Sequence, residues 1–472
     1  MSRIRTIRSL SRLLQQKKSN NEYSLDCFVS GKAQTTSGSL DSDVSKGILI
    51  EPMKKISILF KKTLVKQFLS LVSIQMVNLF IPLLVIPYVS RILGPEKLGI
   101  INFATSFLTY FILIVNYGFD LSATREISVN KENRKKLNDI VNTTLYCKTV
   151  LFIFSSILYF TIILLSTKFS SELYLYSISY LLLISSVFYS AWLFQGLQKL
   201  SVFTFYNLLF RILSVALIFV LVKAKSDFIK YQFINGITAL ITGVTTLWIA
   251  KKRYHFSFEI LPFNRIIDKI KISFTLFLSV VIVNFNTTST IVILGLLTNY
   301  LIVGYYSAAL KVYSVIASLS LLPLNQVMFP HMAQEFNKSK EAGLIFMRKI
   351  IPKILLLFSI VSILLILFSN LIIHILYGNQ FLESVNILKT LAPLLVISTL
   401  VNIICYQIML NLKMDRYFLK INAIGFAVNI LLTFVLVPIF KAYGTCYSLY
   451  FIEISIIFAS VSILKSYDIK LF

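Results

Sequence analysis

Residues 354–374 read ILLLFSIVSILLILFSNLIIH, a run without Asp, Glu, Lys or Arg. A transmembrane helix needs ~20 mostly apolar residues, so this run can cross a bilayer once. Similar runs recur along the chain with short polar breaks between them. The other eleven cover residues 67–90, 99–118, 143–167, 173–194, 202–222, 231–250, 272–297, 304–327, 387–411, 418–440 and 443–464. The pattern predicts an all-α polytopic membrane protein with about twelve transmembrane helices, because the alternation typical of membrane β-strands is absent.

The composition supports this prediction. The chain has 472 residues, of which 57% are apolar and 14% are charged, whereas soluble domains have roughly 25% charged residues. Twelve helices would take about 240 residues, which leaves little material for a large water-soluble domain. The net charge of +26 would indicate nucleic acid binding in a soluble protein. Here the apolar fraction makes the membrane the first explanation, and we expect no nucleic-acid partner.

The distribution of basic residues predicts the orientation of the chain. Connections on one side carry 27 Lys and Arg residues, and connections on the other side carry seven. Lys and Arg accumulate in cytoplasmic loops, so the side with 27 is the cytoplasmic one. We therefore expect both termini to lie in the cytoplasm.

The chain divides into a polar beginning and two apolar halves. Residues 1–52 are rich in Ser, Lys and Arg and have no apolar run longer than three residues. Two interpretations stay open for them: a disordered basic tail, or a wrongly assigned start, with Met53 as the natural one. We expect residues 53–250 to form an N-terminal six-helix bundle and residues 272–472 a C-terminal one.

Residues 251–271 connect the two predicted bundles. Phe263, Ile266, Ile267 and Ile270 recur at helical spacing, with charged residues on the other face. This pattern predicts an amphipathic helix that lies on the inner leaflet and links the bundles. Docking of a cytoplasmic partner on this helix is the alternative.

Two short echoes suggest that the halves are repeats. Residues 99–104 (GIINFA) and 304–309 (GYYSAA) open the second and eighth predicted helices. Residues 219–222 and 434–437 both read FVLV, in the fifth and eleventh helices. The echoes favour a duplication of six helices, repeated about an axis along the membrane normal.

Motifs of catalysis and metal binding are missing from the sequence. It has no P-loop, no H-E-x-x-H and no G-x-S-x-G. The four Cys and three His residues are scattered and form no zinc-ligand spacing. We therefore expect neither an enzyme nor a protein with a cofactor or a metal ion.

Some polar side chains lie deep in the predicted spans, where an ionised group costs ~2.5–3.5 kcal/mol unless it faces a cavity or a partner. The charged ones are Arg211, Lys311 and Glu453. The uncharged ones include Asn78, Asn284 and Asn286. They come from both halves at similar depth, which predicts a water-filled central cavity. The Asn residues can instead tie helices together, and Glu453 is either an ion-pair partner or a protonatable coupling site.

The charges indicate the sign of the cargo. The predicted cavity contains two basic residues, Arg211 and Lys311, and one acidic residue, Glu453. Its net charge is therefore +1, which favours an anion. Arg matches phosphate oxygens in a bidentate fork, so we expect a phosphate-bearing substrate. Lys148, in contrast, lies near the start of span 143–167, and we expect it to extend to the inner interface.

Several motifs resemble those of a known family. They are PYVSRILGPEKLG at residues 87–99, YGFDLSATRE at 117–126, WLFQG at 192–196 and VGYYSAALK at 303–311. With Glu453 and residues 376–378, they resemble Wzx-type bacterial polysaccharide flippases, of the multidrug/oligosaccharidyl-lipid/polysaccharide exporter superfamily. The resemblance covers residues 53–472. Arg91, Arg125 and Lys311 match basic positions of the family motifs, whereas many relatives carry an acidic residue just before Lys311.

The resemblance implies two six-helix bundles around a central cavity in the bacterial cytoplasmic (inner) membrane. It also implies that an undecaprenyl-diphosphate-linked oligosaccharide repeat unit of O-antigen or capsule moves from the inner to the outer leaflet by alternating access. Arg211, Lys311 and the Asn residues would line the cavity, with Arg91 and Arg125 as cytoplasmic-side or gate charges. The expected partners are the lipid-linked oligosaccharide, the bilayer, and a polysaccharide polymerase with its chain-length complex. Two alternatives remain: a multidrug or metabolite cation antiporter, and a non-transporting scaffold of a glycan assembly complex.

Overall fold

The structure is a computed structural model that describes residue 81, residues 84–257 and residues 262–469, without the side chains of residues 263 and 283–287. All regular secondary structure in these ranges is helical, and ten helices are long and apolar enough to cross a membrane. The prediction of an all-α polytopic membrane protein is confirmed. The predicted tail, Met53 and Asn78 lie outside the described residues.

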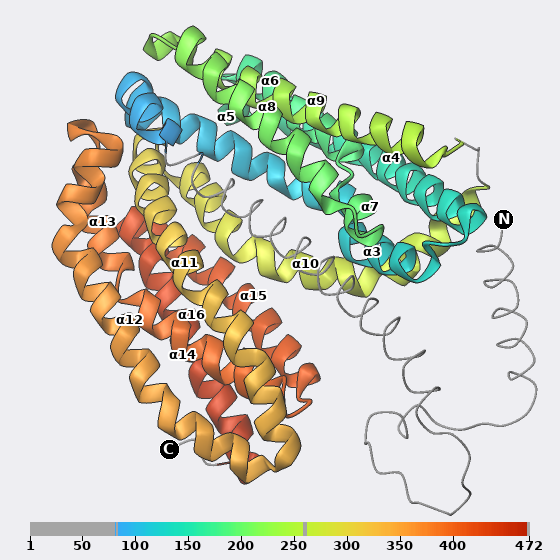
Figure 1. Cartoon of the computed structure of the whole chain (residues 1–472). Helices are drawn as coiled ribbons and strands as arrows, with labels where there is room; N and C mark the ends of the chain where they lie inside the picture. Colours follow the sequence, from blue (N-terminus) through green and yellow to red (C-terminus); the bar gives the residue numbers. More distant parts are fainter. Residues whose placement is uncertain (1–80, 82–83, 258–261, 470–472) are drawn as a thin grey trace, which may run out of the picture. The chain divides into compact units, whose positions relative to one another are not determined.

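The N-terminal half, shown from blue to light green in Figure 1, comprises the helices before residue 255. They are the helical segment 84–116, α3 (Phe119–Asn130), α4 (Arg134–Leu165), α5 (Thr167–Ser170), α6 (Leu173–Phe188), α7 (Ala191–Gly196), α8 (Leu200–Leu221), the 3-10 turn η2 (Lys225–Asp227) and α9 (Phe228–Tyr254). The segment 84–116 turns at Gly94, which has a φ of 73°, and we call its part before Gly94, residues 84–93, the first helix. This left-handed backbone suits glycine and marks the boundary between the first two predicted spans.

The C-terminal half, from yellow to red in Figure 1, comprises the helices after residue 262. They are α10 (Phe263–Leu297), α11 (Tyr300–Lys338), α12 (Lys340–Tyr377), the turn η3 (Asn379–Phe381), α13 (Glu383–Leu391), α14 (Leu394–Asn402), the π-helix η4 (Ile403–Met409), α15 (Asp415–Phe440) and α16 (Ala442–Ser466). The predicted linker 251–271 divides between the end of α9 and the start of α10, which continues without a break as a 35-residue helix.

Several helices extend beyond the predicted spans at one end. We call this the basic end: α4, α10, α12 and α15 begin there, and α9, α11 and α16 end there, among many Lys and Arg residues. Span 304–327, for example, lies inside the 39-residue helix α11. A polar segment that follows an apolar one can continue the same hydrogen-bond ladder in water, so hydropathy alone underestimates helix length. We call the other end of the helices the opposite end.

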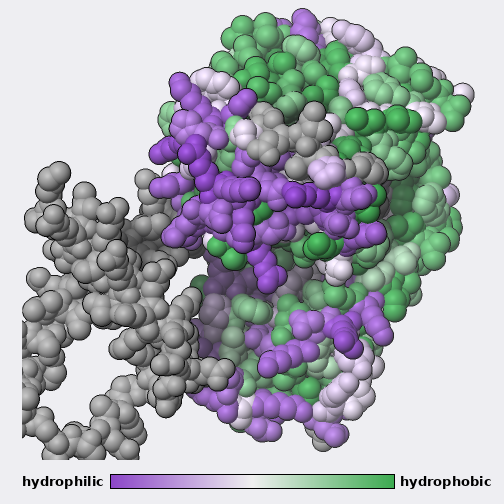
Figure 2. Space-filling view, turned by 90° about the vertical axis from the view of Figure 1, so that its right-hand side faces the viewer, coloured by the Kyte–Doolittle hydropathy of each residue, from purple (hydrophilic) through white to green (hydrophobic). Residues whose placement is uncertain are grey.

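The outer surface is largely apolar. Leu165, Leu367 and Phe458 are 80%, 69% and 70% exposed, as expected of side chains that face lipid rather than water. Figure 2 shows hydrophilic side chains gathered in two regions, one across the middle and one at the bottom of the view, with apolar surface over much of the rest. This distribution fits a helix bundle that crosses a bilayer.

The two halves meet through equivalent positions of the predicted repeat. A Cβ on Gly99 would collide with Tyr300 O, and a Cβ on Gly304 would collide with Pro95 O. Three residues further along each helix, Asn102 Nδ2 donates a hydrogen bond to Ser307 Oγ at 2.7 Å. Glycine lets the two backbones approach closely, as at other membrane helix crossings. The crossing therefore requires a residue without a side chain at both positions.

Lys148 does not reach the interface, so that prediction is wrong. Its side chain is fully buried, and Nζ donates hydrogen bonds to Ser186 O at 3.2 Å and Tyr189 O at 3.4 Å. Helix α4 begins at Arg134, which places Lys148 about four turns inside the helix. Because α6 ends at Phe188, the ammonium group satisfies carbonyls at a helix C-terminus, where a cation is favoured.

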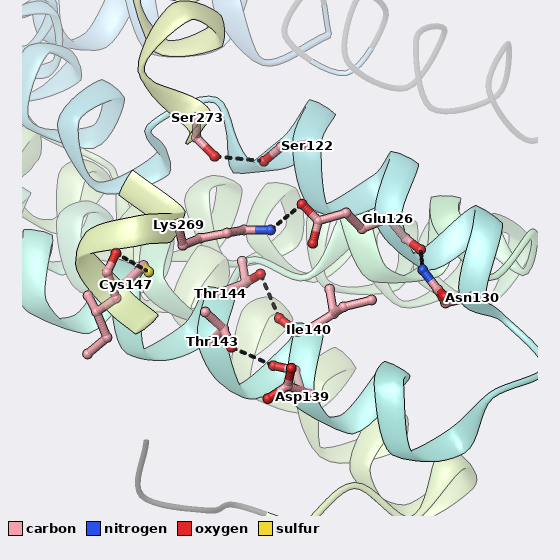
Figure 3. A network of polar contacts seen from close by, with 11 residues as sticks. Ser122, Glu126, Asn130, Asp139, Ile140, Thr143, Thr144, Cys147, Lys269 and Ser273 are labelled. Carbon is pink, nitrogen blue, oxygen red and sulfur yellow. Dashed lines mark hydrogen bonds and ion pairs between the residues drawn. The ribbon is translucent and has the colours of Figure 1, made fainter. Parts of the chain in front are cut away.

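A polar network ties the start of α10 to the N-terminal half at the basic end (Figure 3). Lys269 Nζ lies 2.5 Å from Glu126 Oε1 of α3, and the hydroxyls of Ser273 and Ser122 lie 3.2 Å apart. Arg265 forms a second ion pair at 2.6 Å with Asp139 of α4. Helix α10 also packs against α11 and α15, so this one helix contacts both halves.

Candidate functional site

A central cavity of about 540 Å³ lies between the two halves. The segment 84–116, α6, α8 and α9 form its N-terminal wall, and α10, α11, α12 and η3 form its C-terminal wall. Its volume is in the range of small-molecule sites, which is about 300–1,000 Å³. This cavity is the candidate functional site.

Arg211 and Lys311 both line the central cavity, one from each half. Arg211 is the one charged residue of α8, and both side chains are exposed to the open space. Hydration in a cavity removes most of the cost of a charge at membrane depth. The structure thus brings together the two cations that the sequence singled out.

The face of α11 explains how Lys311 reaches the cavity. Gly304, Ser307, Ala308, Lys311 and Ser314 all line it. Their spacing of three and four residues places them on one side of a helix. The small side chains before Lys311 leave room in front of its ammonium group, so a ligand can approach it.

Neutral polar groups complete the wall. Asn102, Thr105 and Ser106 come from the segment 84–116, and Gln232 and Asn235 come from α9. Gln232 Nε2 donates a hydrogen bond to Ser179 Oγ at 3.0 Å, and Asn235 Nδ2 donates one to Tyr231 O at 3.0 Å. These bonds hold the amides in fixed orientations at the cavity wall.

The cavity is positive. Within the described parts of the chain, its lining contains two basic residues and no Asp or Glu. The apolar walls of the cavity focus the field of such an unbalanced pair, which attracts anions and repels cations. The site is therefore suited to an anionic ligand.

Glu453 lies apart from this cavity, within the C-terminal half. Ser398 Oγ donates a hydrogen bond to Glu453 Oε1 at 2.9 Å, and the hydroxyl of Tyr313 lies 3.4 Å from Ser398 Oγ. Glu453 Oε2 is buried without a hydrogen-bond partner, and no Lys or Arg of residues 84–257 or 262–469 pairs with this carboxylate.

The remaining predicted site residues lie in different places. Asn78 is outside the described residues, and the structure describes the α10 backbone but not the side chains of Asn284 and Asn286. Arg125 is exposed on α3 near the basic end. Arg91 lies at the opposite end of the first helix, where Nη2 donates a hydrogen bond to Ile375 O of α12 at 3.0 Å.

Contacts between the halves close the cavity at the opposite end. Arg91 caps the end of α12. Lys168 caps the end of α10, with Nζ at 2.7 Å from Leu296 O and 3.0 Å from Thr298 O. Ser90 Oγ donates a hydrogen bond to Leu376 O at 3.1 Å. Two cations of the N-terminal half thus bind helix C-termini of the C-terminal half, where the macrodipole favours positive charge.

Sequence reasoning missed the neutral wall. Gln232 and Asn235 stand three residues apart near the start of span 231–250, and Ser307 stands four residues before Lys311. Spacing from the known cations would have found Ser307 and Ser314. Gln232 and Asn235 share no helix with a deep charge, so only the packing of α9 against α8 reveals them. No group of three or more His, Cys, Asp or Glu residues able to hold a metal ion occurs in the part of the chain that the structure describes.

A family described as "Polysaccharide biosynthesis protein" matches residues 64–336, more than half of the chain. The chain belongs to this family. A "Putative O-antigen transporter" of Escherichia coli (strain K12) is 27% identical over 82% of this chain and 94% of the relative. A "Putative O-antigen transporter" of Shigella dysenteriae is 25% identical over 85% of this chain and 100% of the relative. The recognition of a Wzx-type polysaccharide flippase family is confirmed.

Solved structures support the same fold for this family member. The lipid II flippase MurJ in an inward closed conformation superposes with a TM-score of 0.67, at 14% identity, over 84% of this chain and 87% of that one. An inward-facing multidrug resistance MATE family transporter of the MOP superfamily superposes with a TM-score of 0.56, at 14% identity, over 83% and 96%. At such identity the likeness shows the fold alone. The protein is a multi-pass membrane protein, since ten helices in its described residues are long and apolar enough to cross a membrane.

Proposed function

We propose that the protein is a flippase that moves an undecaprenyl-diphosphate-linked oligosaccharide repeat unit from the inner to the outer leaflet of the bacterial cytoplasmic membrane. The observation that carries the proposal is the pair Arg211 and Lys311, which face one cavity without an acidic residue in its described lining. The names of the two O-antigen transporters point to the same class of cargo.

A diphosphate fits this pair for physical reasons. It carries neighbouring negative charges that need compensation on leaving water. A guanidinium group binds phosphate oxygens in a bidentate fork, and an ammonium group adds a compact second charge. The fixed amides of Gln232 and Asn235 and the hydroxyls of α11 supply partners for sugar hydroxyls. The polyprenyl chain stays in the apolar surroundings.

The transport cycle is alternating access between the two halves. The positive-inside rule assigns the basic end to the cytoplasm, so the contacts of Arg91 and Lys168 close the outer side. The lipid head enters from the inner side, binds the two cations and leaves after those contacts break. Lack of a basic partner for Glu453 among the described residues favours coupling by a proton or cation over a structural ion pair.

The test removes both cations. Cells whose own copy is deleted receive the double variant Arg211→Ala/Lys311→Ala, and surface glycan and the leaflet of its lipid-linked precursor are measured. We expect loss of surface glycan and accumulation of the precursor in the inner leaflet. The matched control is Lys349→Ala/Lys353→Ala, which removes two exposed cations from α12 and should leave glycan unchanged.

The alternatives give different results. A scaffold of a glycan assembly complex would tolerate loss of both cations, so normal surface glycan in Arg211→Ala/Lys311→Ala, with the protein present in the membrane, contradicts the proposal. A cation antiporter would gain from the same change, because the cavity would no longer repel a positive ligand. Resistance of the cells to organic cations measures that outcome.

A further inference from the structure

We propose that a small side pocket next to Arg211, with an apolar part to its wall, binds the first isoprenoid unit of the lipid, which fixes the orientation of the cargo in the cavity. This inference rests on the proposed function, because it assumes a diphosphate joined to a hydrocarbon chain. It goes further by assigning the tail to a place within the N-terminal half.

The side pocket has a volume of about 70 Å³. Residue 81 and the start of the segment 84–116 form one wall, α8 forms the second and α9 forms the third. Five apolar residues line it, Ile81, Val85, Ile86, Val215 and Ile218, together with the polar Arg211, Ser214, Tyr231 and Asn235. The pocket is too small for an oligosaccharide, but the apolar part of its wall suits a branched hydrocarbon.

Arg211 connects the two spaces. Arg211, Tyr231, Asn235 and Ile86 line both the side pocket and the central cavity, whereas Lys311 lines the central cavity alone. The guanidinium group thus stands where a polar space meets an apolar one. A polyprenyl diphosphate has the same arrangement, since its charge follows directly on a hydrocarbon chain.

This match sets the orientation of the bound lipid. The phosphate next to the isoprenoid chain binds Arg211, and the phosphate next to the sugar lies on the side of Lys311. The chain then follows α8, whose nearby Ile212 and Leu213 are 56% and 45% exposed on the outer apolar surface. The tail would therefore leave through the wall formed by the first helix and α8.

The wall is closed beyond the pocket by Tyr88. Its hydroxyl shares one proton between Val222 O at 2.8 Å and Phe219 O at 3.2 Å, and its ring lies 4.5 Å from that of Phe219. These contacts join the first helix to the end of α8. They limit the pocket toward the opposite end, so the tail is directed across the wall at the depth of Arg211.

Binding of two probes to the full chain in lipid nanodiscs tests the inference. Farnesyl diphosphate carries a diphosphate and three isoprenoid units, and inorganic diphosphate carries the charge alone. The variant Val215→Trp fills the side pocket, and the control Val220→Trp places the same ring on the exposed face of α8, where Val220 is 66% exposed. We expect Val215→Trp to raise the Kd of farnesyl diphosphate about tenfold, because the Trp ring displaces part of the hydrocarbon chain from the pocket. The Kd of inorganic diphosphate should stay unchanged.

Inorganic diphosphate binding also reports that the variant is folded. A second measurement needs no variant: a photoreactive farnesyl diphosphate should label peptides that contain residues 84–86 and 214–218. Equal effects of Val215→Trp and Val220→Trp, or labelling of α10 and α11 in place of α8, would overturn the inference.

The proposed function fails in a different way. If Arg211→Ala/Lys311→Ala binds inorganic diphosphate as well as the unaltered protein does, the cationic site itself is wrong. If those substitutions abolish binding while Val215→Trp has no effect on farnesyl diphosphate, the function stands and the tail site is wrong.

Discussion

The ion pair between Lys269 and Glu126 allows a sharp test of how α10 is held to the N-terminal half. The substitution Glu126→Gln keeps the shape of the side chain and removes its charge. Lys269 is 8% exposed, so its ammonium group would lose its charge partner in a buried place, whereas Glu126 is 39% exposed. Removal of the Glu126 charge should therefore lower the free energy of unfolding more than removal of the Lys269 charge.

The burial of each partner sets the magnitude. Removal of one member of a buried pair costs about 3–5 kcal/mol, because the other charge stays without compensation. Partial exposure of Glu126 lets water approach, so we expect about 2–3 kcal/mol for Glu126→Gln. Lys269→Met leaves a carboxylate that can turn toward water and should cost about 1 kcal/mol. The double variant removes both charges and should cost no more than Lys269→Met alone.

Thermal unfolding in detergent, followed by tryptophan fluorescence, measures these differences. Asp139→Asn is the matched control, because its ion pair with Arg265 also joins the start of α10 to the N-terminal half, through α4, but both side chains are about half exposed. An exposed pair contributes about 0–1 kcal/mol. We expect the unfolding midpoint of Glu126→Gln to fall by several degrees and that of Asp139→Asn to change little. Addition of Lys269→Met to Glu126→Gln should restore most of the lost midpoint. Equal midpoints for Glu126→Gln and Asp139→Asn would refute the argument from burial.

Three further predictions concern the contacts between the halves. Gly304→Ala places a Cβ against Pro95 O and should reduce surface glycan and the unfolding midpoint, whereas Gly425→Ala meets the flexible end of Ile456 at 3.3 Å and should change both slightly. Arg91→Gln with Lys168→Gln removes two helix caps, each of about 0.3–1 kcal/mol, and should speed labelling of a cysteine placed at the cavity residue Ser314 by an impermeant reagent added outside. Asn102→Leu removes a hydrogen bond of about 1 kcal/mol, and it should raise the same labelling rate by a smaller factor.

The sequence predicted the helical fold because the bilayer imposes a length and a composition on each crossing. It did not predict helix ends: span 143–167 lies inside α4, Arg134–Leu165, except for its last two residues. The misplacement of Lys148 has a different cause, because its direction is set by tertiary packing and not by its place along the span. The carbonyls of Ser186 and Tyr189 that receive it come from another helix, and no local pattern indicates them.

The candidate site shows the same division. Charges at membrane depth are rare and costly, which is why Arg211 and Lys311 could be singled out without a structure. Glu453 has the same signature but lies beside Ser398, outside the described lining of the central cavity. Depth along a helix can be counted from the sequence, but the direction in which a side chain points around the helix depends on packing. Gln232 and Asn235 needed that second kind of information.

The repeat acquires a physical meaning from the contact between the halves. Residues 99 and 304 correspond in the two sequence echoes, and each presses against the backbone that precedes the other. Residues 102 and 307 also correspond, and they share a hydrogen bond. A pair of equivalent helices that meets about a two-fold axis must place equivalent residues against each other, so a requirement for glycine at one site becomes a requirement at both. This accounts for an echo that would otherwise be a short coincidence.

The two ends of the molecule are held by different chemistry, and this difference bears on how the halves can move. At the opposite end, Arg91 and Lys168 bind carbonyls at helix C-termini, which water can satisfy when the contact breaks. At the basic end, Lys269 is buried against Glu126, and separation would leave a charge without a partner. The contacts at the opposite end are thus the cheaper ones to open. Since α10 packs against α3 and α4 of the N-terminal half and against α11 and α15 of the C-terminal half, any movement between the halves must change the contacts of α10. The same helix that joins the halves would therefore set the range of their movement.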